Sequence, residues 1–317
     1  MTASKKTAPL PLGPPHDPSD YPPFAVTADI ALFTIRDGRF QLLLIERGQP
    51  PFLGRLALPG GFLHPDEDAE TAARRELFEE TALDAGSGHL EQLRSYSTPD
   101  RDPRQRVVTV AFWAILPALE PVHGGTDARA ARFVPVEDLE ADIAAAAIAG
   151  PGGHLAFDHD RIVTDAISRA RSKLEYTTFA ARFCPSEFTM TDLRLVYEAV
   201  WGTELEPANF RRKVEGIEGF IQPSGRSTSD RASDEPRHWS EPGERESWSV
   251  QMLAHRSQSP PAMSESRLLG AAPPDPAPAP PMQGSSDTSG RRRGRPASLY
   301  EWAGGEDLFP PFRRPGT

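Results

Sequence analysis

The sequence has a single cysteine and no long hydrophobic run, and each absence excludes a class of protein. Cys184 alone cannot form a disulfide within the chain, which excludes a disulfide-stapled secreted domain. No stretch approaches the roughly 18 apolar residues that a membrane-spanning helix needs. The N-terminal segment carries two lysines, but its apolar part is short and interrupted by proline, unlike a signal peptide. We therefore expect a cytoplasmic protein with no membrane partner.

Proline, in contrast, is abundant, and its distribution separates a packed part of the chain from weakly structured parts. The chain has 34 prolines, and most of its apolar residues lie in the first two-thirds of the 317 residues. Segments poor in apolar residues cannot offset the entropy of ordering them. The predicted division is a disordered N-terminal tail over 1–22, an α/β domain over 23–150, a helical domain over 151–225, a disordered insertion over 226–290, a basic run with a wing strand over 291–303, and a tail over 304–317.

The first domain alternates strands and helices. Residues 26–34 and 40–46 are apolar, β-branched runs separated by Arg-Asp-Gly, which is typical of a β-hairpin. The elements predicted after the hairpin are an amphipathic helix over 67–81, strands over 107–116 and 131–134, and a helix that opens at 136. Strands on both sides of a helix predict a mixed α/β domain that ends near Gly150.

The first predicted helix carries a cluster of glutamates. Since a helix advances by about 100° per residue, Glu76, Glu79 and Glu80 fall within an arc of roughly 100° and share one face. Like charges this close repel each other, and a hard divalent cation is their natural partner. The alternative is a solvated surface helix. Such a face would intersperse lysines, whereas only Arg74 and Arg75 balance the cluster here.

This helix and the loop before it resemble the signature of the Nudix hydrolase superfamily. The segment from Gly61 to Leu83 follows the pattern G-x5-E-x7-R-E-U-x-E-E-x-G-U, with Ala82 in place of the last glycine. The resemblance implies an α/β/α sandwich with a mixed sheet, in which Mg²⁺, or Mn²⁺, lies beside a diphosphate and activates a water. The roles it implies are metal ligation by Glu76, Glu79 and Glu80, orientation of a glutamate by Arg75, support of the loop by Glu67, and substrate contact at Gly60 and Gly61. The general base lies either on this helix or on a separate loop.

A second charged segment, Pro99–Arg106, follows the first domain's helix. Its three arginines, Arg101, Arg104 and Arg106, can hold phosphate or ribose because guanidinium groups bind phosphate in a bidentate manner. They can equally be solvated or pair with the two aspartates of the same segment. Glu91-Gln92-Leu93 followed by this loop resembles the ADP-ribose-recognising Nudix branch, which includes the Nudix-related transcriptional regulators of NAD metabolism. The resemblance favours a functional loop.

The second domain is mostly helical, with helices predicted over 160–174, 191–201 and 207–215. Three short helices followed by the strand-like segment 219–221 predict a winged helix-turn-helix domain. The segment 296–302 alternates like a strand and follows a basic run, so we expect it to supply a second wing strand. On this interpretation a long insertion lies within the wing hairpin, which a fold tolerates because loop-closure entropy grows slowly with length.

The second domain also resembles the winged helix of the same regulators. The similar segments are Leu155–His159, Lys173–Tyr176, Phe188–Met190 and Asn209–Lys213. In that family the Nudix domain senses ADP-ribose or a related NAD metabolite, and the winged helix binds operator DNA as a dimer. The resemblance therefore implies a homodimer with double-stranded DNA as a partner, although the net charge is -10. The DNA contacts expected are Asn209, Arg211, Arg212 and Lys213 on the third helix, and Arg293 and Arg295 in the basic run.

Two functions from different classes stay open. The first is a Nudix hydrolase that cleaves the diphosphate of ADP-ribose or a related nucleoside diphosphate derivative with Mg²⁺ and, through a DNA-binding domain, takes part in metabolite-responsive regulation of NAD metabolism. The second is a non-catalytic ADP-ribose-sensing transcriptional regulator. Some members of that family lack parts of the Nudix signature, which we call the Nudix box, and have no activity. A third is a Nudix enzyme whose winged helix contacts only protein. All box carboxylates are present, which favours retained hydrolysis.

Overall fold

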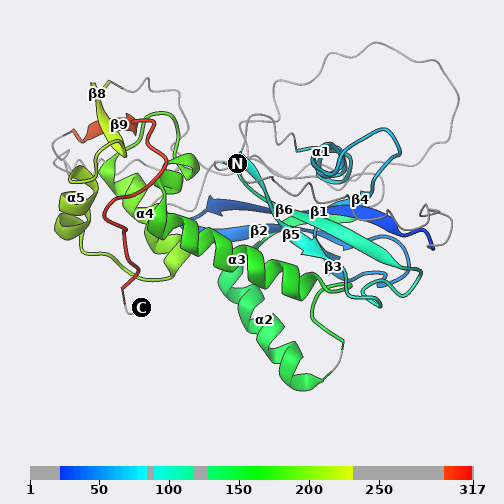
Figure 1. Cartoon of the computed structure of the whole chain (residues 1–317). Coiled ribbons are helices and arrows are strands. Elements are labelled where there is room, and N and C mark those ends of the chain that lie inside the picture. Colours follow the sequence, from blue (N-terminus) through cyan, green and yellow to red (C-terminus); the bar gives the residue numbers. More distant parts are fainter. Residues whose placement is uncertain (1–21, 84–88, 117–127, 151, 231–295, 316–317) are drawn as a thin grey trace, which may run out of the picture.

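The N-terminal domain of the computed structural model is built on a seven-stranded mixed sheet (Figure 1). The structure describes residues 22–83, 89–116, 128–150, 152–230 and 296–315. The strands are β1 (Ala25–Arg36), β2 (Arg39–Arg47), β3 (Leu56–Ala57), β4 (Gly60–Phe62), β5 (His89–Tyr96), β6 (Val107–Ile115) and β7 (Ala128–Pro135). They form the order β3-β2-β1-β6-β5, with β4 added to β1 and β7 to β2. Among these described strands, β1 and β6 are the only pair that runs parallel.

Helices cover both faces of this sheet. α1 (Ala69–Thr81) lies on one face, and α2 (Val136–Ala149) and α3 (His159–Tyr176) lie on the other (Figure 1). The alternation of β1 explains the two layers: Ile30 and Leu32 pack with α1, whereas Phe33 and Ile35 point into the larger core on the opposite face. The predicted α/β/α sandwich with a mixed sheet is confirmed.

The turn and the helix ends near the Nudix signature agree with the local sequence signals. The hairpin between β1 and β2 turns at Asp37 and Gly38, which both have positive φ as a two-residue hairpin requires. α1 begins after Asp68, whose carboxylate accepts the Thr71 N–H, and it ends at Ala82 with a left-handed φ of 58°. The unpredicted strand β5 is polar and buries only Leu93 and Tyr96, so its sequence carries little strand periodicity.

The C-terminal domain is a winged helix, as predicted. It contains a 3-10 helix η2 (Thr178–Phe183), α4 (Met190–Trp201), α5 (Pro207–Glu215), and the wing strands β8 (Ile221–Ser227) and β9 (Ser298–Trp302), which pair antiparallel. Residues 226–230 of the insertion predicted over 226–290 are described, and the first two of them end β8. The rest of the insertion lies outside the described residues. The predicted N-terminal tail lies outside them except for Pro22.

Residues 304–317, predicted as a tail, fold back onto the winged helix over the part that the structure describes. Leu308 and Phe312 are 4% and 3% exposed, and their backbone N–H groups donate to carbonyls at the end of α3. The Phe312 ring lies 4.8 Å from that of Tyr197 and 5.3 Å from that of Phe210. Leu308 and Phe312 are isolated apolar residues outside any periodic segment, so they pack in the core although no sequence pattern predicted it.

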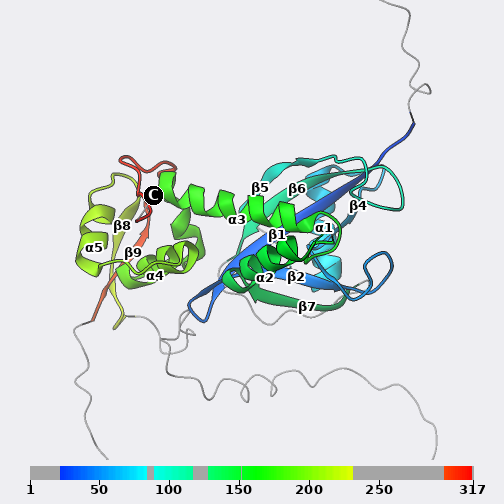
Figure 2. The same cartoon turned by 90° about the horizontal axis from the view of Figure 1, so that it is seen from below.

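α3 joins the two domains. Its first turn contacts the Nudix sheet and its last turn contacts the winged helix, as Figure 2 shows from below. With 18 residues and a rise of 1.5 Å per residue, the helix is about 27 Å long. None of the helices in the described ranges has both the length and the apolar character needed to cross a membrane.

Candidate functional site

The Nudix box gathers its charges around one guanidinium group. Arg75 on α1 donates to Glu67 at 2.6 Å, to Glu76 at 2.8 Å and to Glu79 at 3.1 Å, and also to the carbonyl oxygen of Phe62 on β4. Arg75 thus contacts three glutamates of the signature, and its role in orienting them stays a prediction. These contacts also attach the helix to the strand that carries the glycines.

The two box glycines are required by close approach. A Cβ atom at Gly61 would overlap the Glu76 carboxylate, and one at Gly60 would overlap the Asp29 carboxylate and the carbonyl oxygen of Ala28. The Gly60 N–H donates to Glu80 at 3.0 Å, and the Glu80 side chain is buried. The glycine strand β4 therefore lies directly against the acidic face of α1.

The three glutamates that pair with Arg75 have different surroundings. Burial raises the pKa of Glu76, and the Arg75 guanidinium opposes that rise. Hydrogen bonds from Arg75 and from the His64 N–H lower the pKa of Glu67 to about 2, so Glu67 remains a carboxylate. The Glu79 side chain is 48% exposed and is the box carboxylate most open to solvent among those paired with Arg75.

The carboxylate oxygens of Glu76, Glu79 and Glu80 are the kind of ligand that a hard divalent cation prefers. Within the described ranges, however, no three acidic, histidine or cysteine side chains gather closely enough to hold a metal ion. The reason is visible in the contacts: Arg75 lies between Glu76 and Glu79, and Glu80 turns to Gly60. Metal ligation by Glu76, Glu79 and Glu80 stays a prediction.

The arginine loop has three different environments. Arg101 is buried, with its guanidinium bidentate to Asp158 at 2.7 and 3.2 Å, so the expectation that it contacts phosphate or ribose is corrected. Arg104 pairs with Asp102 at 2.7 Å and reaches the Phe62 ring beside the box. Arg106 donates to a backbone carbonyl and lies over the exposed Phe24 ring. Of the three, Arg104 lies next to the glycine strand.

An aromatic and basic cluster next to this loop was not predicted. The Phe52 and Phe157 rings lie 4.9 Å apart, and both residues have a left-handed φ, which is unusual for bulky side chains. The guanidinium of Arg47 lies 4.7 Å from the Phe157 ring, and that of Arg104 lies 5.8 Å from it. Burial lowers the pKa of Arg47, and the neighbouring Arg104 charge lowers it further.

A buried polar network was also missed. Asp29 on β1 accepts from the Thr109 hydroxyl at 2.7 Å and lies 3.6 Å from Arg101, which pairs with Asp158. His159 accepts the Leu58 N–H at 3.0 Å. Asp29 lies within the apolar run of β1, and a buried carboxylate needs a partner. Its position in the sequence could therefore have indicated this network.

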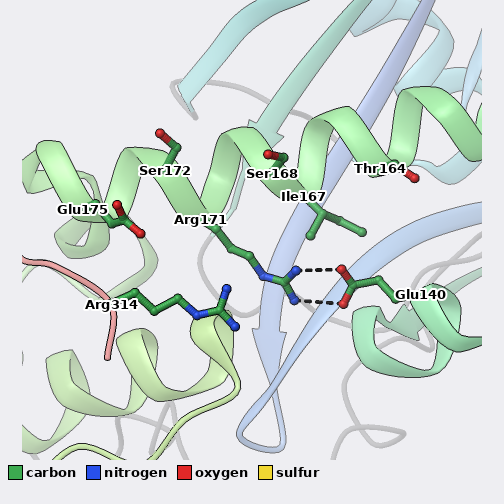
Figure 3. Close-up of a pocket in the computed structure, with 8 residues that line it drawn as sticks. All are labelled: Glu140, Thr164, Ile167, Ser168, Arg171, Ser172, Glu175 and Arg314. Atoms are coloured by element: carbon green, nitrogen blue, oxygen red, sulfur yellow. Dashed lines mark hydrogen bonds and ion pairs between the residues drawn. The ribbon is translucent and has the colours of Figure 1, made fainter. Parts of the chain in front are cut away.

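A hollow of about 370 Å³ lies elsewhere, between α2, α3 and the C-terminal segment (Figure 3). Arg171 of α3 crosses it to make two hydrogen bonds to Glu140 of α2 at 2.6 and 2.9 Å. The same guanidinium donates to the carbonyl oxygen of Val200, at the end of α4. None of the predicted site residues lines this hollow. Arg171 links α2, α3 and α4.

α5 is the candidate nucleic-acid interface. Phe210 and Val214 are buried, whereas Asn209, Arg211, Arg212 and Lys213 are all exposed, as the sequence reasoning expected. Glu206 caps the helix by accepting the N–H groups of the first turn. Arg211 also donates to the Tyr300 hydroxyl of β9 at 3.2 Å, which ties the basic helix to the wing. Arg293 and Arg295 lie outside the described residues.

Comparisons with known proteins agree with this architecture. The family model of the NUDIX domain matches residues 24–151, and that of the NrtR DNA-binding winged helix domain matches residues 180–234. The chain is 34% identical over 202 residues to the ADPR responsive transcriptional repressor NtrR of Acinetobacter baylyi, which is 63% of this chain and 75% of that protein. It is 39% identical over 126 residues to the ADP-ribose pyrophosphatase of Methanocaldococcus jannaschii, or 39% of this chain and 64% of that protein.

A solved structure aligns across both domains. NrtR of Shewanella oneidensis, crystallised with a 27mer DNA, superposes with a TM-score of 0.50 at 28% identity over 66% of this chain and 90% of that chain. The two family models place a NUDIX domain before an NrtR DNA-binding winged helix domain in this chain. The chain therefore belongs to the NrtR family, whose members join a Nudix domain to an NrtR DNA-binding winged helix domain.

Proposed function

We propose that the Nudix domain binds ADP-ribose or a related nucleoside diphosphate derivative and hydrolyses its diphosphate, and that the winged helix binds duplex DNA in a ligand-dependent manner. The observation that carries the proposal is the complete box around Arg75 in the same chain as an exposed basic α5. The printed names of the relatives support both parts, since one is an ADPR responsive repressor and the other an ADP-ribose pyrophosphatase. We include in the proposal a role in the metabolite-responsive regulation of NAD metabolism, as the family resemblance implies.

In the proposed reaction the glycine strand and α1 bind the diphosphate together. Gly60 and Gly61 let the strand lie directly against the Asp29 and Glu76 carboxylates, and Arg104, beside Phe62, is the loop arginine that we place on the ligand. Glu76, Glu79 and Glu80 would hold Mg²⁺ or Mn²⁺, which when bound neutralises phosphate charge and activates a water. Glu67 keeps Arg75 in place, and Arg75 orients Glu76 and Glu79.

The hydrolytic part is tested by incubating the purified protein with ADP-ribose, NADH, NAD⁺ and nucleoside triphosphates in the presence of Mg²⁺. The preferred substrate should be cleaved between its phosphorus atoms, and Glu79→Gln or Glu80→Gln should lower turnover by at least about 100-fold, because charge stabilisation at phosphorus is lost. Glu70→Gln is the matched control, since Glu70 is an exposed glutamate of the same helix that pairs with Arg74. Wild-type turnover in the two box variants, or in excess chelator, would contradict the assignment.

A non-catalytic sensor is the second candidate function. It is favoured by the relative in Acinetobacter baylyi, whose printed name is that of an ADPR responsive transcriptional repressor and not of an enzyme. Calorimetry with ADP-ribose separates the two functions. Tight binding without turnover in Mg²⁺ or Mn²⁺ would establish the sensor, whereas binding with turnover would establish the enzyme.

The DNA-binding part is tested by fluorescence anisotropy with promoter duplexes of the protein's own operon and of neighbouring NAD-metabolism genes. Affinity should fall steeply with salt, and the double replacement of Arg211 and Arg212 by alanine should weaken binding and reduce the salt slope by about one per lost phosphate contact. Arg169→Ala, an arginine of α3 that pairs with Glu91, is the control. Absence of specific binding with and without ADP-ribose would contradict the regulator function. The homodimer expected from the family is checked by analytical ultracentrifugation.

A further inference from the structure

The first turn of α3 lies against the segment that leads into the glycine strand. His159 accepts the backbone N–H of Leu58 at 3.0 Å, two residues before Gly60. The histidine is 3% exposed, so water cannot replace it as the acceptor for that N–H. Burial lowers the pKa of His159 and favours a neutral ring, in agreement with Nδ1 acting as an acceptor.

The segment before α3 makes a second set of contacts with the same region. The Ala156 N–H donates to the Leu56 carbonyl oxygen at 2.8 Å. Asp158 pairs with the buried Arg101, which also lies 3.6 Å from Asp29. Asp29 is the direct neighbour of Gly60 in the register between β1 and β4. The start of α3 is thus attached to β3 through the backbone, to Leu58 just before the glycine strand through His159, and to Asp29 opposite Gly60 through the buried ion pairs.

One three-residue segment, Leu58–Gly60, is consequently bound from two sides. The box helix α1 binds it through Glu80 and the Gly60 N–H at 3.0 Å, and α3 binds it through His159 and the Leu58 N–H. Any ligand that engages the Glu80 carboxylate competes with the Gly60 N–H and changes the position of this segment. Because protein cores are close-packed, a shift on one side is passed to the contact on the other.

The far end of α3 belongs to the winged helix. The carbonyl oxygen of Tyr176 accepts the Leu308 N–H, and that of Arg171 faces the indole N–H of Trp201. Arg171 also joins Glu140 to the end of α4 (Figure 3). A displacement of the first turn of α3 therefore reaches the DNA-binding domain through a single continuous helix.

We propose that His159, supported by Asp158, is a positioning residue through which the occupied Nudix site acts on α3 and so on the DNA affinity of the winged helix. This inference rests on the proposed function, since it requires that ADP-ribose and DNA both bind. A ligand changes DNA affinity only if it contacts the free and DNA-bound states differently, and the Leu58–His159 hydrogen bond supplies that difference.

The test measures thermodynamic coupling in the full chain. DNA is a duplex selected from a random library by the wild-type protein. ADP-ribose is supplied as its non-hydrolysable α,β-methylene analogue, and Mg²⁺ is present because the anionic diphosphate meets the Glu80 carboxylate only through a cation. DNA affinity with and without ADP-ribose, and ADP-ribose affinity alone, are measured for His159→Leu, His159→Gln and His159→Asn. Leucine removes the acceptor, glutamine places it elsewhere, and asparagine keeps an acceptor near the position of Nδ1. Asp165→Asn is the control, since Asp165 joins α3 to Tyr96 of β5 far from the glycine strand.

In the wild type we expect ADP-ribose to change DNA affinity within the about 5- to 150-fold range typical of allosteric coupling. His159→Leu and His159→Gln should bind each partner separately but reduce the change to less than about 2-fold, whereas His159→Asn and Asp165→Asn should retain it. If the leucine variant does not fold, the glutamine variant decides. Coupling that survives in both, or that is lost equally in Asp165→Asn, would overturn the proposal. A wild type that binds neither ADP-ribose nor DNA would instead overturn the proposed function.

Discussion

At the scale of single residues, ion pairs around Arg75 join the glutamates of the Nudix signature. Glu67 illustrates the effect of such a pair, because its carboxylate accepts from Arg75 at two atoms and from the His64 N–H. These contacts lower its pKa to about 2 from the ordinary 4.5. The charged form is thus favoured in the folded protein compared with the unfolded chain.

We therefore predict that the contribution of Glu67 to stability disappears in acid. Above pH 4.5 the residue is ionised in both states and its stabilisation is complete, whereas between pH 4.5 and about 2 the unfolded chain takes up a proton that the folded protein does not. The difference in free energy of unfolding between the wild type and Glu67→Gln should be largest near neutral pH and should shrink over that interval. Urea unfolding at a series of pH values measures it. A difference that stays constant with pH would refute the role of the ion pair.

Arg101 makes the opposite point, because its role is structural rather than ligand-binding. Its side chain is 4% exposed and lies between Asp158 and Asp29. We predict that Arg101→Ala lowers the free energy of unfolding by about 3–5 kcal/mol, since two carboxylates lose their buried counter-charge. The control Arg106→Ala removes an arginine of the same loop that donates to the Thr98 carbonyl, and it should cost less than about 1 kcal/mol. Denaturant unfolding compares them, and equal losses would contradict this account.

At the scale of elements, the end of α1 is the place where this chain departs from the box pattern. Ala82 takes the left-handed position at which the pattern has glycine, and its N–H still donates to the Phe78 carbonyl oxygen at 2.8 Å. The helix therefore keeps its closing hydrogen bond but carries the strain of a Cβ atom at positive φ. The carboxylates lie before this residue, so their orientation does not depend on it.

Replacing Ala82 by glycine should stabilise the protein by about 1 kcal/mol, because the left-handed conformation is strained for alanine and not for glycine. The matched control is Gly202→Ala at the end of α4, where φ is 64° and no neighbouring atom lies close to an added Cβ. That change should destabilise by a similar amount. Thermal unfolding of both variants gives the comparison; a neutral or destabilising Ala82→Gly would show that the neighbouring chain, and not φ, controls the helix end.

At the scale of the whole molecule, the winged helix is completed by residues distant in sequence. Phe312 inserts among Tyr197, Trp201 and Phe210, after the long segment 231–295 that the structure does not describe. The second wing strand β9 also comes from beyond that segment. The DNA-binding domain is thus assembled from both sides of the insertion.

We predict that Phe312→Ala lowers the free energy of unfolding of the winged helix by about 3–5 kcal/mol, as is usual for loss of a buried phenylalanine. Phe309→Ala, three residues earlier in the same segment, should have almost no effect because that ring is 87% exposed. Denaturation followed by the fluorescence of the tryptophans, which include Trp201 at 5.8 Å from Phe312, reports the change. Equal stability of the two variants would mean that the C-terminal segment does not stabilise the domain.

The sequence by itself determined the elements whose signals are local. The hairpin at Asp37–Gly38, the box spacing on α1 and the amphipathic helices α4 and α5 were all predicted, because turn chemistry and helical periodicity act within a few residues. The family resemblance, which depends on those same motifs, was confirmed with them.

Only the tertiary structure decided which charges face ligand and which face each other. Arg101 meets Asp158 across 57 residues, and Leu58 meets His159 across 101. No periodicity relates residues so far apart, and a guanidinium has the same sequence signal whether it binds phosphate or a buried carboxylate. Long-range pairing at the start of α3 therefore attaches the first residues predicted for the second domain to the Nudix domain, which no local motif indicated.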